Sequence, residues 1–393
     1  MSFENDPKDT YMRADDEFEK NLQHILAKYR GRDEKQSVKP FRLVLVSVLS
    51  TLLLTAAALG LAGKSGALDF LFAPYRDTSF TYVASYRAGV KGWVITGYYG
   101  QETAVVIPDR IGRVPVSGIG AGAFARSEKL TSVTLPSGLE VIGDSAFFAC
   151  EKLTAVAFGD SAPFGGSKLE TIGNSAFADC PGLTGFVIPQ GTRSIGDLAF
   201  SGCAGLEEIT LPDSLTRIGE GAFSDCGKLK SINIPAGIDK VSGGLFAGCL
   251  NLESVHIPDS VKSIGSAAFY DCRNLGSIRL PKDLSSIPDY AFWRCESLTG
   301  ALIPDNVTNI GDSAFYWCHR LEAVTLPKGL AGIGRQAFAW CEALSTTALP
   351  DSLSFIGDKA FSFCDSLILK VSEGSYAARY AKEQSIPFEI MND

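Results

Sequence analysis

The chain has few of the residues that enzymes use for acid–base or nucleophilic chemistry. Only three histidines, His24, His256 and His319, occur in 393 residues, and they lie far apart in the sequence. No G-x-S-x-G motif, no P-loop and no C-x-x-C pair is present. A nucleophile needs a neighbouring base, and zinc sites need closely spaced ligands, so these absences argue against hydrolases and zinc sites. The sequence therefore predicts a protein that is not an enzyme, with no catalytic residue, no metal and no cofactor.

Positive charge is also scarce. The chain has 36 Lys and Arg against 44 Asp and Glu, which gives a formal net charge of −8 at pH 7. Residues 1–42 contain as many cations as anions, so the excess of negative charge belongs to the rest of the chain. Nucleic-acid binding requires clustered cations that neutralise phosphates. We therefore expect no nucleic-acid partner.

One long stretch, residues 43–63, has no charged side chain at all. About 20 apolar residues in a helix span the hydrocarbon core of a bilayer, so this stretch is predicted to be a transmembrane helix. A buried core helix and a cleaved signal peptide are the alternatives, and the long charged segment before the stretch argues against the second. Six cations between Lys28 and Arg42 precede it and few follow, so the N-terminus is expected to be cytoplasmic. This pattern predicts a single-pass signal anchor in the cell membrane, with the residues from 64 onward outside the cell.

The N-terminal 80 residues divide into three predicted parts. Residues 1–42 form a cytoplasmic tail, 43–63 the membrane helix, and 64–80 a juxtamembrane linker. Within the tail, apolar residues at helical spacing predict an amphipathic helix over residues 14–30, and a partly ordered tail is the alternative.

The chain is rich in one repeated unit, which its cysteines mark. Nine of the ten cysteines are separated by steps of 23 residues, and the first lies 30 residues before the second. They are Cys150, Cys180, Cys203, Cys226, Cys249, Cys272, Cys295, Cys318, Cys341 and Cys364. A period in the twenties with matched apolar positions is typical of a solenoid. The seven extra residues of the first interval fall in a Gly/Pro-rich stretch, 159–166, which is predicted to be a surface loop.

The unit reads A-F-x-x-C-x-x-L-x-x-V-x-L-P-x-x-L-x-x-I-G-x-x. Its V-x-L part alternates like a short strand, with Ile209 and Leu211 facing inward and Thr210 facing outward. Proline then ends the strand because it lacks a backbone donor. No unit can bury its own Leu, Ile and Phe, so a core forms only when units stack. We expect an N-terminal cap at 81–115, the solenoid at 116–370 and a C-terminal cap at 371–393.

The C-terminal cap has its own predicted structure. Ser375 can cap a short helix that continues to about Glu383, and a last strand follows at residues 387–390. These elements would cover the open end of the stacked core.

The unit resembles the BspA-like class of leucine-rich repeats. The resemblance covers about residues 81–390 and includes the opening phrase ITGYYG…VVIPDRIGRVPVSGIGAGAF, the L-P-x-x-L-x-x-IG-x-x-AF-x-x-C unit and the closing GSYAARYAKEQSIPFE. It implies a right-handed coil with one short parallel strand per repeat. It also implies a bacterial surface protein, since members of this class are commonly implicated in adhesion to host or matrix proteins and to other cells.

The cysteines are predicted to be buried free thiols that pack as small apolar residues. Neighbouring coils should stack ~4.8 Å apart. This spacing places adjacent Cα atoms within disulfide range, but it leaves the Cβ atoms farther apart than the ~3.8 Å usual in disulfides. Disulfides between coils and metal binding are the alternatives, and a straight row of thiols does not readily form a tetrahedral cage.

Aromatic side chains gather at the two positions between Phe and Cys in the later units. They are Tyr270, Trp293, Tyr316, Trp317, Trp340 and Phe363, and earlier units have small or acidic residues there. Exposed aromatic stripes mark recognition surfaces, because flat rings stack on sugars or fill pockets of a partner. The alternative is that the rings only pack against one another along the edge of the solenoid.

A second candidate surface is the outward position of the short strands. It reads Thr210, Asn233, His256, Arg279, Leu302 and Thr325 through the middle units. Among these, Asn233, His256 and Arg279 are candidate contact residues for a partner chain, and an ordinary solvated sheet face is the alternative.

Together these patterns predict a membrane-anchored cell-surface protein that binds or adheres to an extracellular protein or glycan. The alternative is a structural spacer or a sensor ectodomain that is coupled to a cytoplasmic partner through residues 14–30.

Overall fold

The computed structural model describes residues 79–85, 92–159 and 168–391. The predicted cytoplasmic tail, amphipathic helix and transmembrane helix, and nearly all of the predicted linker, lie outside these residues. No helix among the described residues is long and apolar enough to cross a membrane. The chain separates into two compact units, and all described residues belong to the second, Tyr75–Asp393.

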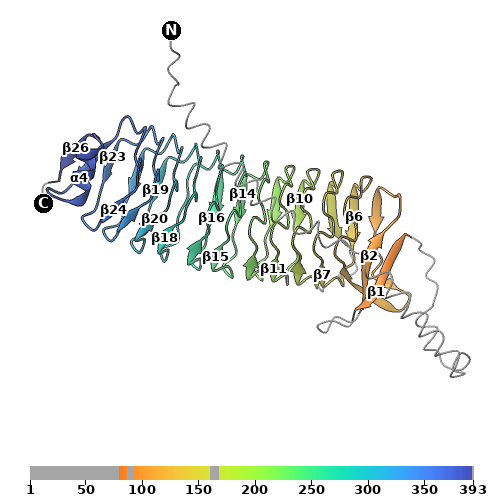
Figure 1. Cartoon of the computed structure of the whole chain (residues 1–393). Coiled ribbons are helices and arrows are strands. Elements are labelled where there is room, and N and C mark those ends of the chain that lie inside the picture. Colours follow the sequence, from red (N-terminus) through yellow and green to blue (C-terminus); the bar gives the residue numbers. More distant parts are fainter. Residues whose placement is uncertain (1–78, 86–91, 160–167, 392–393) are drawn as a thin grey trace, which may run out of the picture. The chain divides into compact units, whose positions relative to one another are not determined.

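The described chain is a right-handed parallel β-solenoid in which each coil lies beside the next (Figure 1). The sequence predicts one short strand per repeat, whereas most coils contain two. The second is a two-residue strand that ends at the Ile of the Ile-Gly pair of the unit, as in Arg217–Ile218. Two residues are too short to show the alternation of a strand in the sequence, which is why the pattern does not reveal it.

The strands form two ladders. The first ladder contains the predicted V-x-L strands: β3 (Ala104–Val106), β6 (Ser132–Leu135), β8 (Ala155–Phe158), β10 (Gly185–Val187), β12 (Glu208–Thr210), β14 (Ser231–Asn233), β16 (Ser254–His256), β19 (Gly300–Leu302), β21 (Ala323–Thr325), β23 (Thr346–Ala348) and β25 (Ile368–Val371). The second ladder contains β5 (Val114–Ile119), β7 (Val141–Ile142), β9 (Thr171–Ile172), β11 (Ser194–Ile195), β13 (Arg217–Ile218), β15 (Lys240–Val241), β17 (Ser263–Ile264), β18 (Ser286–Ile287), β20 (Asn309–Ile310), β22 (Gly332–Ile333) and β24 (Phe355–Ile356).

The phenylalanines stack along the core, one per coil. Neighbouring rings lie 4.9 to 6.0 Å apart between centroids and are nearly parallel. Their backbone also links the coils, since the N–H of Phe147 donates to the carbonyl of Ala176 in the next coil at 2.7 Å. These turns therefore form a third line of backbone hydrogen bonds, which the sequence pattern does not show.

Glycine after the second strand allows the coils to approach closely. A Cβ at Gly196 would lie 2.5 Å from the backbone nitrogen of Asn174 in the preceding coil. Two coils have other residues at this position, Ser242 and Pro288. The second ladder is interrupted before each of these coils, between β13 and β15 and between β17 and β18. The first ladder is interrupted there as well, between β12 and β14 and after β16. In both coils the hydrogen bond of the glycine N–H to the preceding coil is missing, because proline has no backbone N–H and Ser242 donates through its hydroxyl instead.

Side-chain and backbone contacts maintain the stack across the first of these interruptions. The hydroxyl of Ser242 donates to the carbonyl of Ile218 at 2.6 Å, where other coils use the glycine N–H. The Phe223 N–H donates to Leu245 O at 3.1 Å across the same junction.

The two ends of the solenoid are covered differently. At the N-terminal end, β1 (Phe80–Ser85) pairs antiparallel with β2 (Gly92–Tyr98), which pairs parallel with β5, and the two-residue β4 (Arg110–Ile111) pairs antiparallel with β5. At the C-terminal end, α4 (Tyr376–Glu383) begins after Ser375, whose hydroxyl accepts the N–H of Ala378 at 3.1 Å. The strand β26 (Phe388–Ile390) then pairs with β25. The predicted helix cap and last strand are thus confirmed.

Candidate binding surfaces

The turn around each phenylalanine determines where its neighbours point. The second residue after Phe has a left-handed backbone in every coil, with φ of 63° at Trp317, 62° at Trp340 and 61° at Phe363. This conformation turns the chain so that the first residue after Phe lies inside and the second lies at the surface. Earlier coils place Gly202 and Gly248 at the second position, and glycine adopts this conformation without a steric penalty.

The predicted aromatic stripe is therefore two rows rather than one exposed surface. Tyr270, Trp293 and Tyr316 are the first residues after Phe, and they expose only 4%, 4% and 3% of their area. Their rings stack at 4.3 Å and 6.0 Å between centroids, so this inner row packs inside the solenoid. The sequence holds a signal that distinguishes the two rows, because glycine and charged residues occur at the second position and never at the first.

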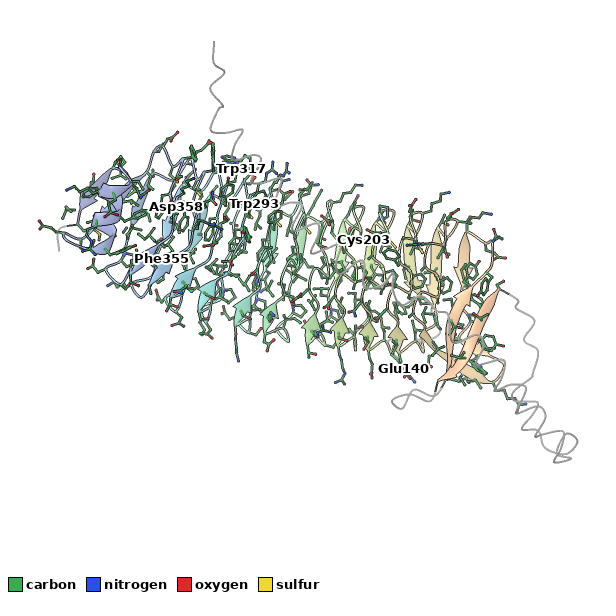
Figure 2. The ribbon with its side chains drawn as sticks, viewed as in Figure 1. Glu140, Cys203, Trp293, Trp317, Phe355 and Asp358 are labelled. Carbon is green, nitrogen blue, oxygen red and sulfur yellow. The ribbon has the colours of Figure 1, made fainter. Side chains whose placement is uncertain are left out.

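The second row remains accessible. Trp317, Trp340 and Phe363, which we call the outer aromatic row, are half-buried. Trp340 stacks on Phe363 at 4.2 Å and lies 6.2 Å from Trp317. Figure 2 shows Trp293 and Trp317 close together on adjacent coils, and their rings meet edge to face at 6.3 Å.

Charged side chains border the outer aromatic row at its N-terminal end. The Arg294 guanidinium lies over the Trp317 ring at 5.0 Å and bonds to Glu296 at 3.1 Å. Arg273 bonds to Asp271 at 2.9 Å. These pairs hold cationic and anionic groups beside exposed ring edges, an arrangement that suits recognition of polar ligands with an apolar face.

His319 completes this border. Its ring lies 5.6 Å from that of Trp317, and its Nδ1 is 3.5 Å from Glu342 Oε1. Burial lowers the pKa of His319 and outweighs the opposing effect of Glu342. The imidazole is therefore neutral at pH 7, so this contact is not an ion pair at that pH.

The strand face has the outward residues that the unit predicts. Thr210, Asn233, His256, Arg279, Leu302 and Thr325 are all exposed. Asn233 and His256 are paired directly across β14 and β16. Arg279 lies in a coil without an assigned first-ladder strand, and it bonds to Asp259 at 3.2 Å with both side chains exposed. The inward partner positions, such as Ile209, are buried.

All ten cysteines are unpaired thiols, and nine of them are buried. Each thiol hydrogen-bonds to the phenylalanine carbonyl of the preceding coil, as Cys203 Sγ does to Phe177 O at 3.1 Å. The same contact recurs up to Cys364, the half-buried member of the ladder. The thiols thus supply a donor to a carbonyl inside the core. Among the described residues, no group of His, Cys, Asp and Glu is arranged to hold a metal ion.

Because these thiols are buried, we expect the solenoid to lose stability at alkaline pH. Burial raises the pKa of the thiols from Cys203 to Cys364, to about 12 for Cys203. An unfolded cysteine titrates near 8.5, so between about pH 8.5 and 12 the unfolded chain releases protons that the folded chain keeps. The urea midpoint should be unaffected by thiols below about pH 8.5 and fall as the pH rises to 10.5.

A cysteine variant distinguishes the protons released by the thiols from those released by tyrosines, which also titrate in this pH range. Cys203→Ala should reduce the number of protons released on unfolding at pH 10.5 by about one. Equal proton release from both proteins would contradict a buried, neutral thiol at this position.

A row of hydrogen-bond acceptors lies beside the glycines and is not among the features predicted from the sequence. The Asp144 carboxylate accepts the N–H of Asn174 at 2.7 Å, and the Asn174 side chain accepts the N–H of Asp197 at 2.8 Å. Asp289 and Asp312 repeat this contact farther along the stack. The signal was available, because Asp or Asn follows the Ile-Gly pair, or Ile-Pro in the case of Asp289, in these coils.

The chain also matches the model of a known repeat family. The model of the BspA type leucine rich repeat region matches residues 117–249, 170–299 and 239–368. No curated protein matches the chain significantly.

Several solved structures are similar to this chain. A leucine-rich repeat protein from Bacteroides ovatus is 27% identical, with a TM-score of 0.52, over 80% of this chain and 98% of that chain. The pneumococcal vaccine antigen PcpA is 17% identical, with a TM-score of 0.52, over 81% of this chain and 98% of that one. A leucine rich repeat protein of T. pallidum is 36% identical over 51% of this chain and 89% of its own, with a TM-score of 0.47.

Proposed function

The chain belongs to the BspA-type leucine-rich-repeat family, and from this premise we propose that it is a non-catalytic binding protein of the bacterial cell surface. The solenoid presents a rigid surface to an extracellular protein or glycan. The uncharged stretch at residues 43–63 anchors it in the membrane, with the N-terminus in the cytoplasm.

The outer aromatic row carries this proposal. Trp317, Trp340 and Phe363 adopt a left-handed backbone, which costs bulky side chains of the order of 1 kcal/mol or more. Five of the other coils use Gly or Asp at the same position, and the remaining three have Arg126, Ala149 and Arg294. Rings that are only half-buried return less apolar burial than the fully buried inner row. A role in recognition explains why these coils retain large rings at an unfavourable backbone position.

The surroundings of this row indicate the kind of ligand. Half-buried tryptophan rings stack on the apolar faces of sugars or cover flat side chains of a protein. The Arg294–Glu296 pair beside Trp317 provides both a donor and an acceptor within the same patch. Asn233, His256 and Arg279 on the strand face are proposed as secondary contacts with a larger partner.

A screen of the full chain against glycan and matrix-protein arrays tests the proposal. The double variant Trp317→Ser, Trp340→Ser should weaken binding of any ligand by about 30-fold for each of the two rings that contacts it, since central aromatic contacts are commonly worth about 2 kcal/mol each. The measurement is the dissociation constant of each array hit.

Phe355→Ser is the matched control, because Phe355 is a 56% exposed aromatic residue on β24, outside the outer aromatic row. It should leave the dissociation constant unchanged. Binding that survives the double variant would move the site to the strand face. Absence of any ligand would favour the spacer or sensor function coupled through residues 14–30.

A further inference from the structure

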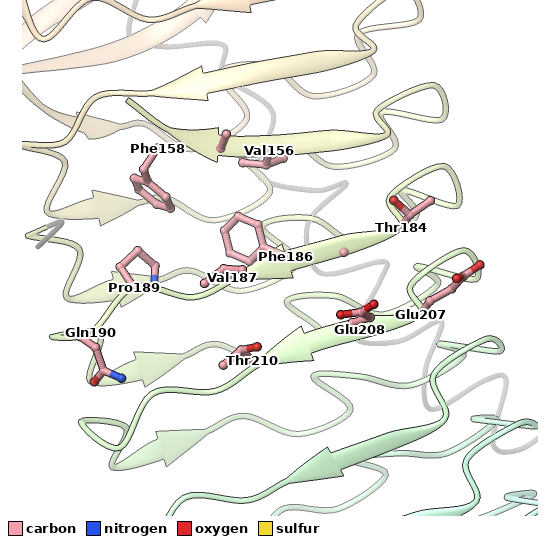
Figure 3. Close-up of a pocket in the computed structure, with 12 residues that line it drawn as sticks. Val156, Phe158, Thr184, Phe186, Val187, Pro189, Gln190, Glu207, Glu208 and Thr210 are labelled. Atoms are coloured by element: carbon pink, nitrogen blue, oxygen red, sulfur yellow. The ribbon is translucent and has the colours of Figure 1, made fainter. Parts of the chain in front are cut away.

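A groove of about 800 Å³ opens on the first ladder where β8, β10 and β12 follow one another (Figure 3). The structure pairs β8 with β6 and β10 with β12, but it does not pair β8 with β10. The seven extra residues of the interval between Cys150 and Cys180 fall between these two strands in the sequence. The groove lies where the two first-ladder strands do not pair, although the same two coils are paired at β7 and β9.

The floor of the groove is apolar. Phe158 and Phe186 lie between β8 and β10, with ring centroids 6.3 Å apart (Figure 3). Phe186 is buried and also packs on Phe177 of the core stack at 5.2 Å, so the floor is rigid. Val187 is 70% exposed and forms an apolar part of the rim.

The rim on the β12 side is acidic. Glu207 and Glu208 are exposed, and both line the groove together with neutral groups such as Thr210 and Gln190. No Lys, Arg or His is among its lining residues. Glu207 bonds to Lys228 at 3.2 Å, whereas Glu208 has no ion pair among the described residues.

These features distinguish a peptide from a sugar as the occupant. Sugars stack on exposed ring faces, but Phe186 is only 3% exposed and Phe158 is half-buried, whereas the aliphatic side chain of Val187 is exposed. An apolar side chain fits this floor, and a cation beside it meets the carboxylate of Glu208. The charge of the rim therefore selects basic segments over acidic ones.

We propose that this groove binds a segment of a partner protein that presents an apolar side chain next to lysine or arginine. The apolar side chain lies over Phe158 and Val187, and the cation pairs with Glu208. This site is separate from the outer aromatic row, and it does not depend on what that row binds.

Fluorescence anisotropy of the full chain with three labelled peptides tests the proposal. The peptides are Lys-Phe-Lys-Val-Lys, its acidic counterpart Glu-Phe-Glu-Val-Glu, and Lys-Ser-Lys-Ser-Lys, which lacks the apolar side chains. The first should bind at least about tenfold more tightly than either of the others, because only it satisfies both floor and rim.

Variants locate the binding. Val187→Lys and Glu208→Lys should each weaken the first peptide by about tenfold or more, and Glu208→Gln should have a smaller effect. Leu302→Lys is the matched control, because Leu302 is 71% exposed at the equivalent outward position of β19 but lies outside the groove. All three positions are exposed, so thermal unfolding of the four variants should show the same midpoint as that of the parent chain.

Three results would overturn the proposal. The first is no difference among the three peptides, and the second is an equal loss of affinity in Leu302→Lys. The third is a loss caused by the Trp317→Ser, Trp340→Ser double variant, which would assign the peptide to the outer aromatic row. Failure of that row to bind any ligand would leave the groove unaffected.

Discussion

Replacing Phe223 by alanine is expected to lower the free energy of unfolding by about 3–5 kcal/mol, the cost of removing a large buried ring and leaving a cavity. Phe223 is fully buried and stacks between Phe200 and Phe246, at 5.6 and 6.0 Å. The neighbouring coils cannot close the gap, because backbone hydrogen bonds of the phenylalanine turns hold their spacing on both sides. The Phe200 N–H donates to Ala222 O, and the Phe223 N–H donates to Leu245 O. Urea denaturation, followed by circular dichroism, measures the change.

The position of Phe223 also allows a test of cooperativity. In a solenoid each coil contacts only its neighbours, so a weakened interface can separate the unfolding of the two sides. Trp293, Trp317 and Trp340 all lie C-terminal to Phe223, so tryptophan fluorescence reports mainly on that side. We expect the fluorescence transition to occur at higher urea than the loss of circular dichroism in Phe223→Ala.

Phe355→Ala is the control for ring removal, since Phe355 is 56% exposed. It should change stability by no more than about 0.5 kcal/mol. A similar loss in both variants would show that the buried stack does not hold the coils together.

Gly196→Ala is the second substitution with a large expected effect. The added Cβ would meet Asn174 N at 2.5 Å and the carbonyl carbon of Gly173 at 2.6 Å. Both are backbone atoms, so no side chain can rotate away, and the coils must separate. Overpacking of this kind costs about 1–3 kcal/mol, and we expect a value at the upper end.

Gly276→Ala is its matched control, because no atom lies within 4 Å of an added Cβ at that position. The control should leave the urea midpoint unchanged or raise it slightly, since alanine restricts the unfolded chain more than glycine does. Hydrogen exchange would localise the damage in Gly196→Ala to the amides of β9, β11 and β13. Protection of these amides at the level of the parent chain would refute close packing as the reason for the glycine.

The natural exceptions to this glycine position support the same reasoning. Ser242 and Pro288 replace glycine, and the ladders are interrupted before both coils. The interruption is tolerated at Ser242 because its hydroxyl bonds to Ile218 O in place of the N–H. The sequence shows these two departures from the unit, but their consequence depends on how closely the backbones approach.

The sequence by itself determined the architecture of the described chain. The 23-residue period, with Phe, Cys, Leu and Ile at constant positions, predicts stacked coils, and these residues are buried in every regular coil. It also determined the C-terminal cap, since the Ser375 N-cap and the helix to Glu383 depend on local residues. A local capping signal and a repeat with a constant period can both be recognised from the sequence alone.

Only the tertiary structure decided which residues are available for binding. Tyr316 and Trp317 are adjacent in the sequence, yet the left-handed turn at Trp317 puts one inside the solenoid and leaves the other at its surface. Likewise, the groove arises because β8 and β10 do not pair, although both have the strand pattern of the unit. The direction of a side chain depends on backbone dihedrals, and the pairing of two strands depends on contacts between residues that are distant in the sequence. A pattern of residue types contains neither kind of information.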